Sequence, residues 1–84
     1  MARVTETAKS RAASRMEGIL KEGMVRKHLT YAELAVRTGV SARTLSDYRK
    51  DPMRLSFAMV ARLSDVLGIP EDRFFDALRN VSSR

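Results

Sequence analysis

The sequence has no cysteine, so neither a disulfide bond nor a thiolate metal site can stabilise the fold. It has no apolar run near the about 20 residues that a membrane-spanning helix needs, and the opening MARVTETAKSRAASR lacks the apolar core of a secretory signal. It also has no nucleophile with a base partner, no phosphate-binding G-x-x-x-x-G-K-[ST] loop and no dinucleotide fingerprint. We therefore expect a cytoplasmic protein that is not an enzyme, with no metal, cofactor, small-molecule substrate or membrane as partner.

Glycine and proline are also scarce, at four and two of 84 residues, whereas alanine, leucine, arginine and methionine are plentiful. The plentiful residues favour helices, and no period-two alternation typical of a β-strand is visible. A chain of this length fits one domain with a small core. The sequence therefore predicts a single, compact all-α domain.

Capping residues and apolar spacing predict five helices. The first is expected over Ser14–Lys27, because S-x-x-E at 14–17 has capping-box spacing and Met16, Leu20 and Met24 recur every four residues. Gly23, beside this apolar stripe, leaves room for another helix to approach closely.

The ends of the chain are assigned less definitely. Residues 1–13 form either an N-terminal arm or an extension of the first helix, and the sequence leaves both alternatives open. Residues 14–80 form the main domain, and residues 81–84 a polar C-terminal tail.

Two short helices follow the first, and only Gly39-Val40-Ser41 separates them. Thr30 is a good N-cap for the earlier one, with Glu33 at the capping-box position, and Gly39 ends it in a conformation that glycine adopts most easily. Ser41 caps the later one. A fourth helix is expected between Ser56 and Gly68, and a fifth from Pro70. The expected core positions of the last two helices are Phe57, Val60, Leu63, Leu67, Phe74, Phe75 and Leu78.

The positive charge is concentrated in one part of the chain. Residues 1–55 carry twelve Lys and Arg against six Asp and Glu, whereas residues 56–84 carry four of each kind. A one-sided positive field attracts polyanions such as nucleic acids, although a basic surface can also serve solubility alone.

Residues 31–50, YAELAVRTGVSARTLSDYRK, resemble a DNA-binding helix-turn-helix. The second helix has only two large apolar residues, Leu45 and Tyr48, so one narrow side packs and the other side is polar. In this motif the second helix enters the major groove of DNA, and the first crosses the backbone.

The wider stretch 16–80 resembles the lambda-repressor-like (Xre/Cro-type) family. The matching features are L-T before the second helix, E-L-A within it, G-V-S at the turn, and L-G-I before an aromatic helix. The resemblance implies a five-helix bundle that regulates transcription by sequence-specific binding to double-stranded DNA, often as a homodimer, and the small size is similar to phage or prophage members. Many members have glycine where His28 stands, so His28 must adopt an unusual φ or the chain must turn differently.

The polar side of residues 42–50 is expected to contact bases through Ala42, Arg43, Thr44 and Asp47. Arg43 is the leading base reader, because a guanidinium fits guanine O6 and N7; the alternative is a surface ion pair with Asp47. Asp47 either accepts from cytosine N4 or orients Arg43. Ala42 is small enough for close approach or for contact with a thymine methyl group.

Contacts to the DNA backbone are expected from Thr30, Tyr31, Ser41, Ser46, Arg49, Lys50 and Arg54. Thr30 and Ser41 are helix caps first, at helix N-termini that attract anions. Tyr31 replaces a phosphate-contacting glutamine of many relatives and would donate through its hydroxyl. For Arg49, Lys50 and Arg54 the alternative is a solvated charge cluster.

A rival hypothesis belongs to a different class. It is a protein-interaction module, such as an antitoxin-like or repressor-binding adaptor, on the same scaffold but without operator binding. Asp47 on the polar side and the missing glutamine at position 31 favour this rival, whereas the concentrated positive charge and ARTLSDYRK favour DNA.

Overall fold

Five α-helices and one short 3₁₀ helix make up the computed structural model, which describes the backbone of residues 8–82 and the side chains of residues 11–79. In chain order these are α1 (Ala8–Lys27), α2 (Tyr31–Thr38), α3 (Ala42–Lys50), η1 (Pro52–Arg54), α4 (Phe57–Leu67) and α5 (Glu71–Ser82). Within residues 8–82 there is no strand. The predicted all-α, five-helix fold is therefore confirmed.

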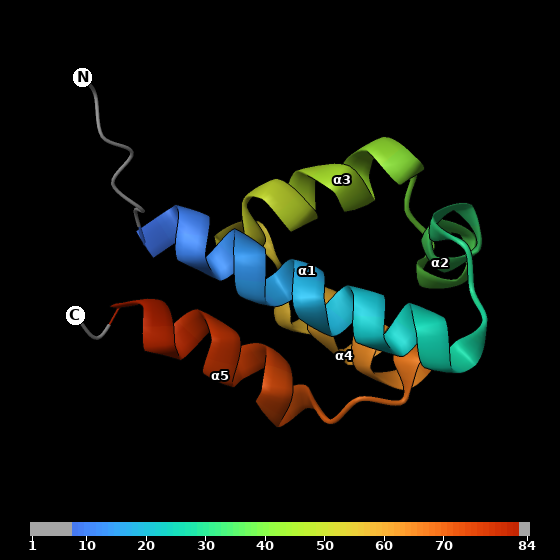
Figure 1. Cartoon of the computed structure of the whole chain (residues 1–84). Coiled ribbons are helices and arrows are strands. Elements are labelled where there is room, and N and C mark those ends of the chain that lie inside the picture. Colours follow the sequence, from blue (N-terminus) through green and yellow to red (C-terminus); the bar gives the residue numbers. More distant parts are fainter. Residues whose placement is uncertain (1–7, 83–84) are drawn as a thin grey trace, which may run out of the picture.

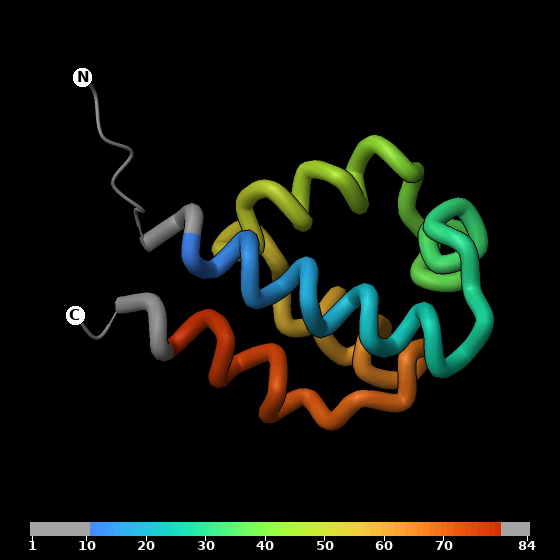
Figure 2. Tube along the Cα trace, in the orientation of Figure 1, coloured from blue at the N-terminus to red at the C-terminus, as the bar shows by residue number. Residues whose placement is uncertain are grey.

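The long helix α1 forms the centre of the bundle. It contacts α3, η1, α4 and α5, whereas α2 packs mainly on α3 and α4. Figure 1 shows α3 and α5 on opposite sides of α1. Figure 2 shows α1 and α5 running side by side in opposite directions. This arrangement leaves the outer side of α3 uncovered by any other helix of the bundle.

One continuous core contains side chains from all five helices. Its fully buried members include Met16, Leu20, Leu34, Leu45, Leu63, Leu67 and Phe74. Phe75 and Leu78 are half-buried and pack against this core, in agreement with the sequence.

The prediction that Phe57 belongs to the core is wrong, because its side chain is 80% exposed. Met59, which is 5% exposed, fills the core at the start of α4 instead. The reason is helical geometry: a three-residue step falls about 60° short of a full turn, so Phe57 lies beyond Val60 on the side away from Leu63.

Helix α1 begins at Ala8 rather than at Ser14. Ser14 is an exposed residue inside the helix, and Ala12 is completely buried. The helix-favouring residues before Ser14 and the burial of Ala12 outweigh the capping-box signal. The extension alternative therefore describes residues 8–13, while an arm at residues 1–7 lies outside the described residues. Helix α5 likewise continues to Ser82, two residues into the expected tail.

The helix caps predicted from the sequence are present in the structure. The Thr30 side chain accepts from the Glu33 N–H at 3.1 Å, and Glu33 Oε1 accepts from the Thr30 N–H at 2.8 Å, which completes the predicted capping box. Gly39 ends α2 at a φ of 79°, and Ser41 caps α3. His28 adopts the unusual conformation that the sequence allowed, with a φ of 56°.

Gly23 lies where α1 comes close to the end of α4. A Cβ atom at this position would lie 2.8 Å from the Leu67 Cβ and 3.0 Å from the Ile69 Cδ1. Both distances are shorter than ordinary van der Waals contact. The absence of a side chain at Gly23 therefore permits this helix contact, as the sequence indicated.

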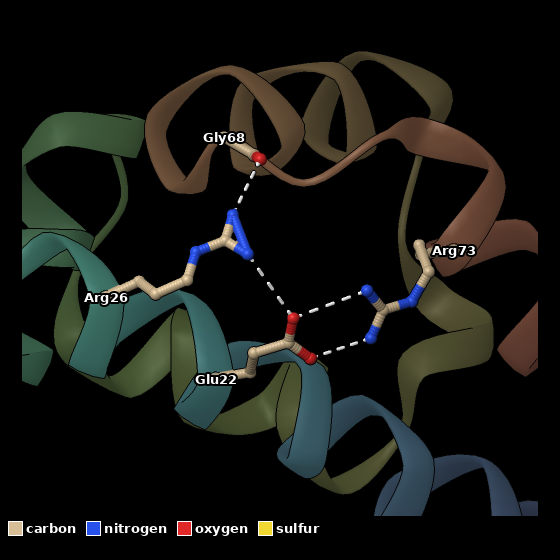
Figure 3. Close-up of polar contacts among 4 residues, drawn as sticks. All are labelled: Glu22, Arg26, Gly68 and Arg73. Atoms are coloured by element: carbon tan, nitrogen blue, oxygen red, sulfur yellow. Dashed lines mark hydrogen bonds and ion pairs between the residues drawn. The ribbon is translucent and has the colours of Figure 1, made fainter.

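An exposed polar network joins α1 to α5 and to the end of α4 (Figure 3). Arg73 donates to both carboxylate oxygens of Glu22, at 2.7 and 3.3 Å. Arg26 lies 3.5 Å from the same carboxylate and donates to the Gly68 carbonyl oxygen at 3.2 Å. The hydrogen bond from Arg73, together with the charges of both arginines, lowers the pKa of Glu22 below its usual 4.5.

Candidate nucleic-acid interface

Helices α2 and α3 are held at a fixed angle by a small set of buried groups. Leu45 of α3 is completely buried, and Ala35 of α2 is 3% exposed. Thr38 is buried and donates to the Leu34 carbonyl oxygen at 2.8 Å. Arg62 reaches from α4 and donates to the Thr38 carbonyl oxygen at 3.2 Å, at the C-terminal end of the α2 dipole. This packing fixes the direction in which α3 presents its outer side.

The outer side of α3 carries four exposed residues, which we call the α3 polar surface: Ala42, Arg43, Asp47 and Lys50. Thr44 and Ser46 lie half-buried at its edges. On the opposite side Leu45 is buried and Tyr48 packs against the core. Of the four predicted base-contacting residues, Ala42, Arg43 and Asp47 therefore lie on one exposed side of α3, and Thr44 lies at its edge.

Arg43 and Asp47 are one helical turn apart, yet no ion pair joins these two described residues. Ion pairs within one helix do form elsewhere in the structure. Arg26 lies 3.5 Å from Glu22 on α1, and Arg79 lies 3.8 Å from Asp76 on α5. In the free protein, therefore, Asp47 does not hold Arg43 in place. The guanidinium of Arg43 is exposed and available to a ligand.

Four of the seven predicted phosphate-contacting residues lie in two groups. Thr30 and Ser41 are at the N-termini of α2 and α3, and their hydroxyl groups are engaged as caps. Ser41 Oγ also donates to Thr44 Oγ1 at 3.0 Å. Lys50 and Arg54 are exposed at the end of α3 and in η1. Contacts of all these residues with DNA stay predictions.

Tyr31 behaves differently from the expectation of a hydroxyl that faces a phosphate. Its hydroxyl oxygen is buried and has no hydrogen-bond partner among the described residues. Burial raises the pKa of this hydroxyl above its usual 10.0, and the opposing influences of Arg49 and nearby Ser46 do not cancel the effect. Ser46 lies near enough to lower this pKa, although the buried hydroxyl oxygen has no hydrogen-bond partner in the described part of the chain. In this conformation a phosphate can reach the backbone N–H of Tyr31 in the first turn of α2, but not its hydroxyl.

Sequence reasoning missed the contact between Tyr31 and Arg49. The guanidinium carbon of Arg49 lies 5.4 Å from the centre of the Tyr31 ring, within the range of a cation–π interaction. The two residues belong to different helices, so no helical spacing in the sequence signals their contact.

A short helix packed at a fixed angle before a second helix with one polar, uncovered side defines the helix-turn-helix class of domains. The model of the family described as Helix-turn-helix matches residues 20–74. The chain therefore belongs to this helix-turn-helix family, in its Xre or lambda-repressor-like form.

Two relatives come from archaea of the genus Methanosarcina and carry the provisional name of HTH-type transcriptional regulatory protein. The chain is 33% identical over 66 residues to the protein of Methanosarcina acetivorans and 32% identical to that of Methanosarcina mazei. Each match covers 79% of this chain but only 20% of the relative, so the chain spans about a fifth of the length of these proteins. No solved structure gives a significant match.

Proposed function

We propose that this chain binds double-stranded DNA in a sequence-specific manner and regulates transcription, with residues 42–50 of α3 in the major groove. The α3 polar surface carries this proposal, because it is the uncovered side of a helix of the size that the groove admits. Arg43 reads a base pair, and Asp47 contacts an adjacent base. Ala42 allows the close approach, and Thr44 contacts a base from the edge of the surface.

The distribution of charge supports DNA over the adaptor hypothesis. The chain has a formal charge of +6, and all of this excess lies in residues 1–55, which include α1 as well as α2, α3 and η1. Arg49 and Lys50 lie in the last turn of α3 and Arg54 lies in η1, where they flank the groove and bind phosphates. An adaptor that docks on a protein has no comparable need for exposed cations around one helix.

We further propose that two copies bind DNA together through the apolar surface around Phe57. The exposed Phe57 ring packs edge-on against Phe75, with ring centres 5.5 Å apart. Beside it lies an apolar groove of about 430 Å³, lined by Leu55, Ser56, Phe57, Val60, Phe75 and Leu78. A two-fold interface brings the same patch of both copies together, so the Phe57 ring of one copy would lie against the groove of the other. The balanced charge of residues 56–84 also avoids strong repulsion between copies.

We also propose a cellular setting for this protein. The protein acts in the cytoplasm, without enzymatic activity and without a cofactor or small-molecule substrate. No helix among residues 8–82 is long and apolar enough to cross a membrane. Origin from a phage or mobile element stays a prediction, and the two archaeal relatives give it no support.

The decisive experiment selects binders from random DNA duplexes at fixed salt. We expect one enriched motif, and a palindrome within it if two copies bind. If about five phosphates are contacted, log K should fall with log salt with a slope of about −4 to −5. The double variant Arg43→Ala/Lys50→Ala should lose the enrichment. Its matched control, Arg15→Ala/Lys21→Ala, removes the same charge from exposed positions of α1 and should keep the motif. An adaptor would yield no motif and a slope near zero.

The dimer proposal has its own test by sedimentation at rising protein concentration. Phe57→Glu should shift the protein towards the monomer. Val36→Glu is the matched control, because Val36 on α2 is 78% exposed, close to the 80% of Phe57, and lies outside the groove. Equal sedimentation of the parent and both variants would contradict a dimer through this groove.

A further inference from the structure

The start of α2 and the end of α3 are joined by one side-chain contact. Tyr31 is the first residue of α2, and Arg49 lies in the last turn of α3. The Arg49 guanidinium carbon is 5.4 Å from the centre of the Tyr31 ring, and both side chains are half-buried. Because the two helices are already linked at Gly39–Ser41, this contact joins them at their other ends.

The hydroxyl of Tyr31 makes no contribution that the structure can identify. The oxygen is buried and has no hydrogen-bond partner among the described residues. A buried polar group without a partner generally costs stability, so its ring, rather than its hydroxyl, must be the useful part of Tyr31. The ring packs against the core and presents one face to Arg49.

A guanidinium that lies over an aromatic ring can keep its binding edge free. The group is planar, so its face can lie on a ring while its N–H donors point outward in the plane. Among the residues with described side chains, no carboxylate forms an ion pair with Arg49. A long side chain that is already ordered also loses less conformational entropy when it binds a ligand.

We propose that Tyr31 is a positioning residue for Arg49: its ring holds the guanidinium at the end of α3 in the orientation that binds a DNA phosphate. The inference rests on the proposed DNA-binding function and replaces the expected phosphate contact of the Tyr31 hydroxyl by an indirect role. It also implies that the contact persists when DNA is bound.

The test measures binding to a short mixed-sequence DNA duplex, which reports on phosphate contacts without a known operator. Tyr31→Phe keeps the ring and should bind as tightly as the parent. Tyr31→Leu keeps an apolar side chain but removes the ring face, and should weaken binding about two- to five-fold. In the Arg49→Ala background the same Tyr31→Leu change should have no further effect. Circular dichroism during heating establishes that each variant is folded.

A second measurement uses the parent protein without any substitution. In the NMR spectrum of the parent, the Arg49 side-chain protons should be shifted by the Tyr31 ring, both alone and with the duplex. Loss of the shift on DNA binding would overturn the inference. The inference would also be overturned if Tyr31→Phe weakened DNA binding as much as Tyr31→Leu, or if Tyr31→Leu did not weaken it. Additive losses of affinity in the double variant of Tyr31→Leu and Arg49→Ala would overturn it as well. A parent that fails to bind the duplex overturns the proposed function itself, which keeps the two failures distinguishable.

Discussion

Arginines on the two sides of α1 have opposite surroundings. On the α5 side, Arg73 and Arg26 share the Glu22 carboxylate, and Arg79 lies 3.8 Å from Asp76. On the α3 side, Arg43 and Lys50 form no ion pair with any residue whose side chain the structure describes. A cation that is paired with an acid is largely neutralised, whereas an unpaired one remains available to a polyanion. The comparison teaches that the number of basic residues matters less than their pairing.

The largest expected effect comes from the core that both sides share. Leu45→Ala removes a fully buried side chain and should lower the free energy of unfolding by about 2–5 kcal/mol. Urea unfolding followed by circular dichroism measures it. Val36→Ala, at an exposed position of α2, should change stability by less than about 0.5 kcal/mol. If α2–α3 unfolds at a lower urea concentration than the rest, the two sides are not one cooperative unit.

The next largest effects distinguish the roles of two cations on the α3 side. Arg43→Ala should cost about 1–3 kcal/mol of binding free energy and relax the preference at one base pair. Lys50→Ala should weaken binding to all sequences alike and reduce the salt slope by about one unit. Competition with duplexes that carry single base changes, repeated at several salt concentrations, distinguishes the two. If Arg43→Ala keeps full affinity and preference, Arg43 does not read a base.

Asp47→Ala sharpens the role of the single acid on the α3 polar surface. The free protein has no Asp47–Arg43 ion pair, so we expect Asp47 to act on its own base pair. Preference should then fall at a position different from that of Arg43, by about 1–3 kcal/mol per base pair. If the loss appears at the Arg43 position and disappears in the Arg43→Ala background, Asp47 instead orients Arg43 in the complex.

The smallest effect concerns the paired side and acid pH. The Glu22 pKa is lowered in the folded state, chiefly by the hydrogen bond from Arg73. A carboxylate of this kind stabilises the fold above its unfolded pKa and loses that contribution as pH falls through the lowered value. Glu22→Gln should therefore reduce the dependence of melting temperature on pH below about 4.5 and leave DNA affinity unchanged. A clear change in DNA affinity would mean that the two sides are coupled.

Features that depend on neighbours in sequence could be predicted. Thr30 with Glu33, Gly39 and Ser41 each act within one helical turn, so the residue types alone identify the turn and the start of α3. The same reasoning placed Arg43 and Asp47 on the exposed side of α3, because Leu45 fixes the rotation of the helix.

Features that depend on distant parts of the chain could not be predicted from the sequence. The exposure of Phe57 depends on how α4 is rotated against α1 and α5, which a short apolar pattern does not define. The contact between Tyr31 and Arg49 arises only once α2 and α3 have packed. The Arg43–Asp47 ion pair was suggested by spacing alone, yet spacing permits such a pair without requiring it, since exposed pairs gain little free energy.

His28 identifies a position at which the protein can be made more stable without altering the α3 polar surface. It follows α1 in the left-handed region, with a φ of 56°, where a residue with a Cβ atom is disfavoured by about 1–2 kcal/mol. Its side chain is exposed. Glycine adopts this conformation without that strain but has more freedom in the unfolded chain, so His28→Gly should raise stability by about 1 kcal/mol or less. Thermal unfolding of His28→Gly beside His28→Ala, which keeps the Cβ atom, measures how much strain the end of α1 contains.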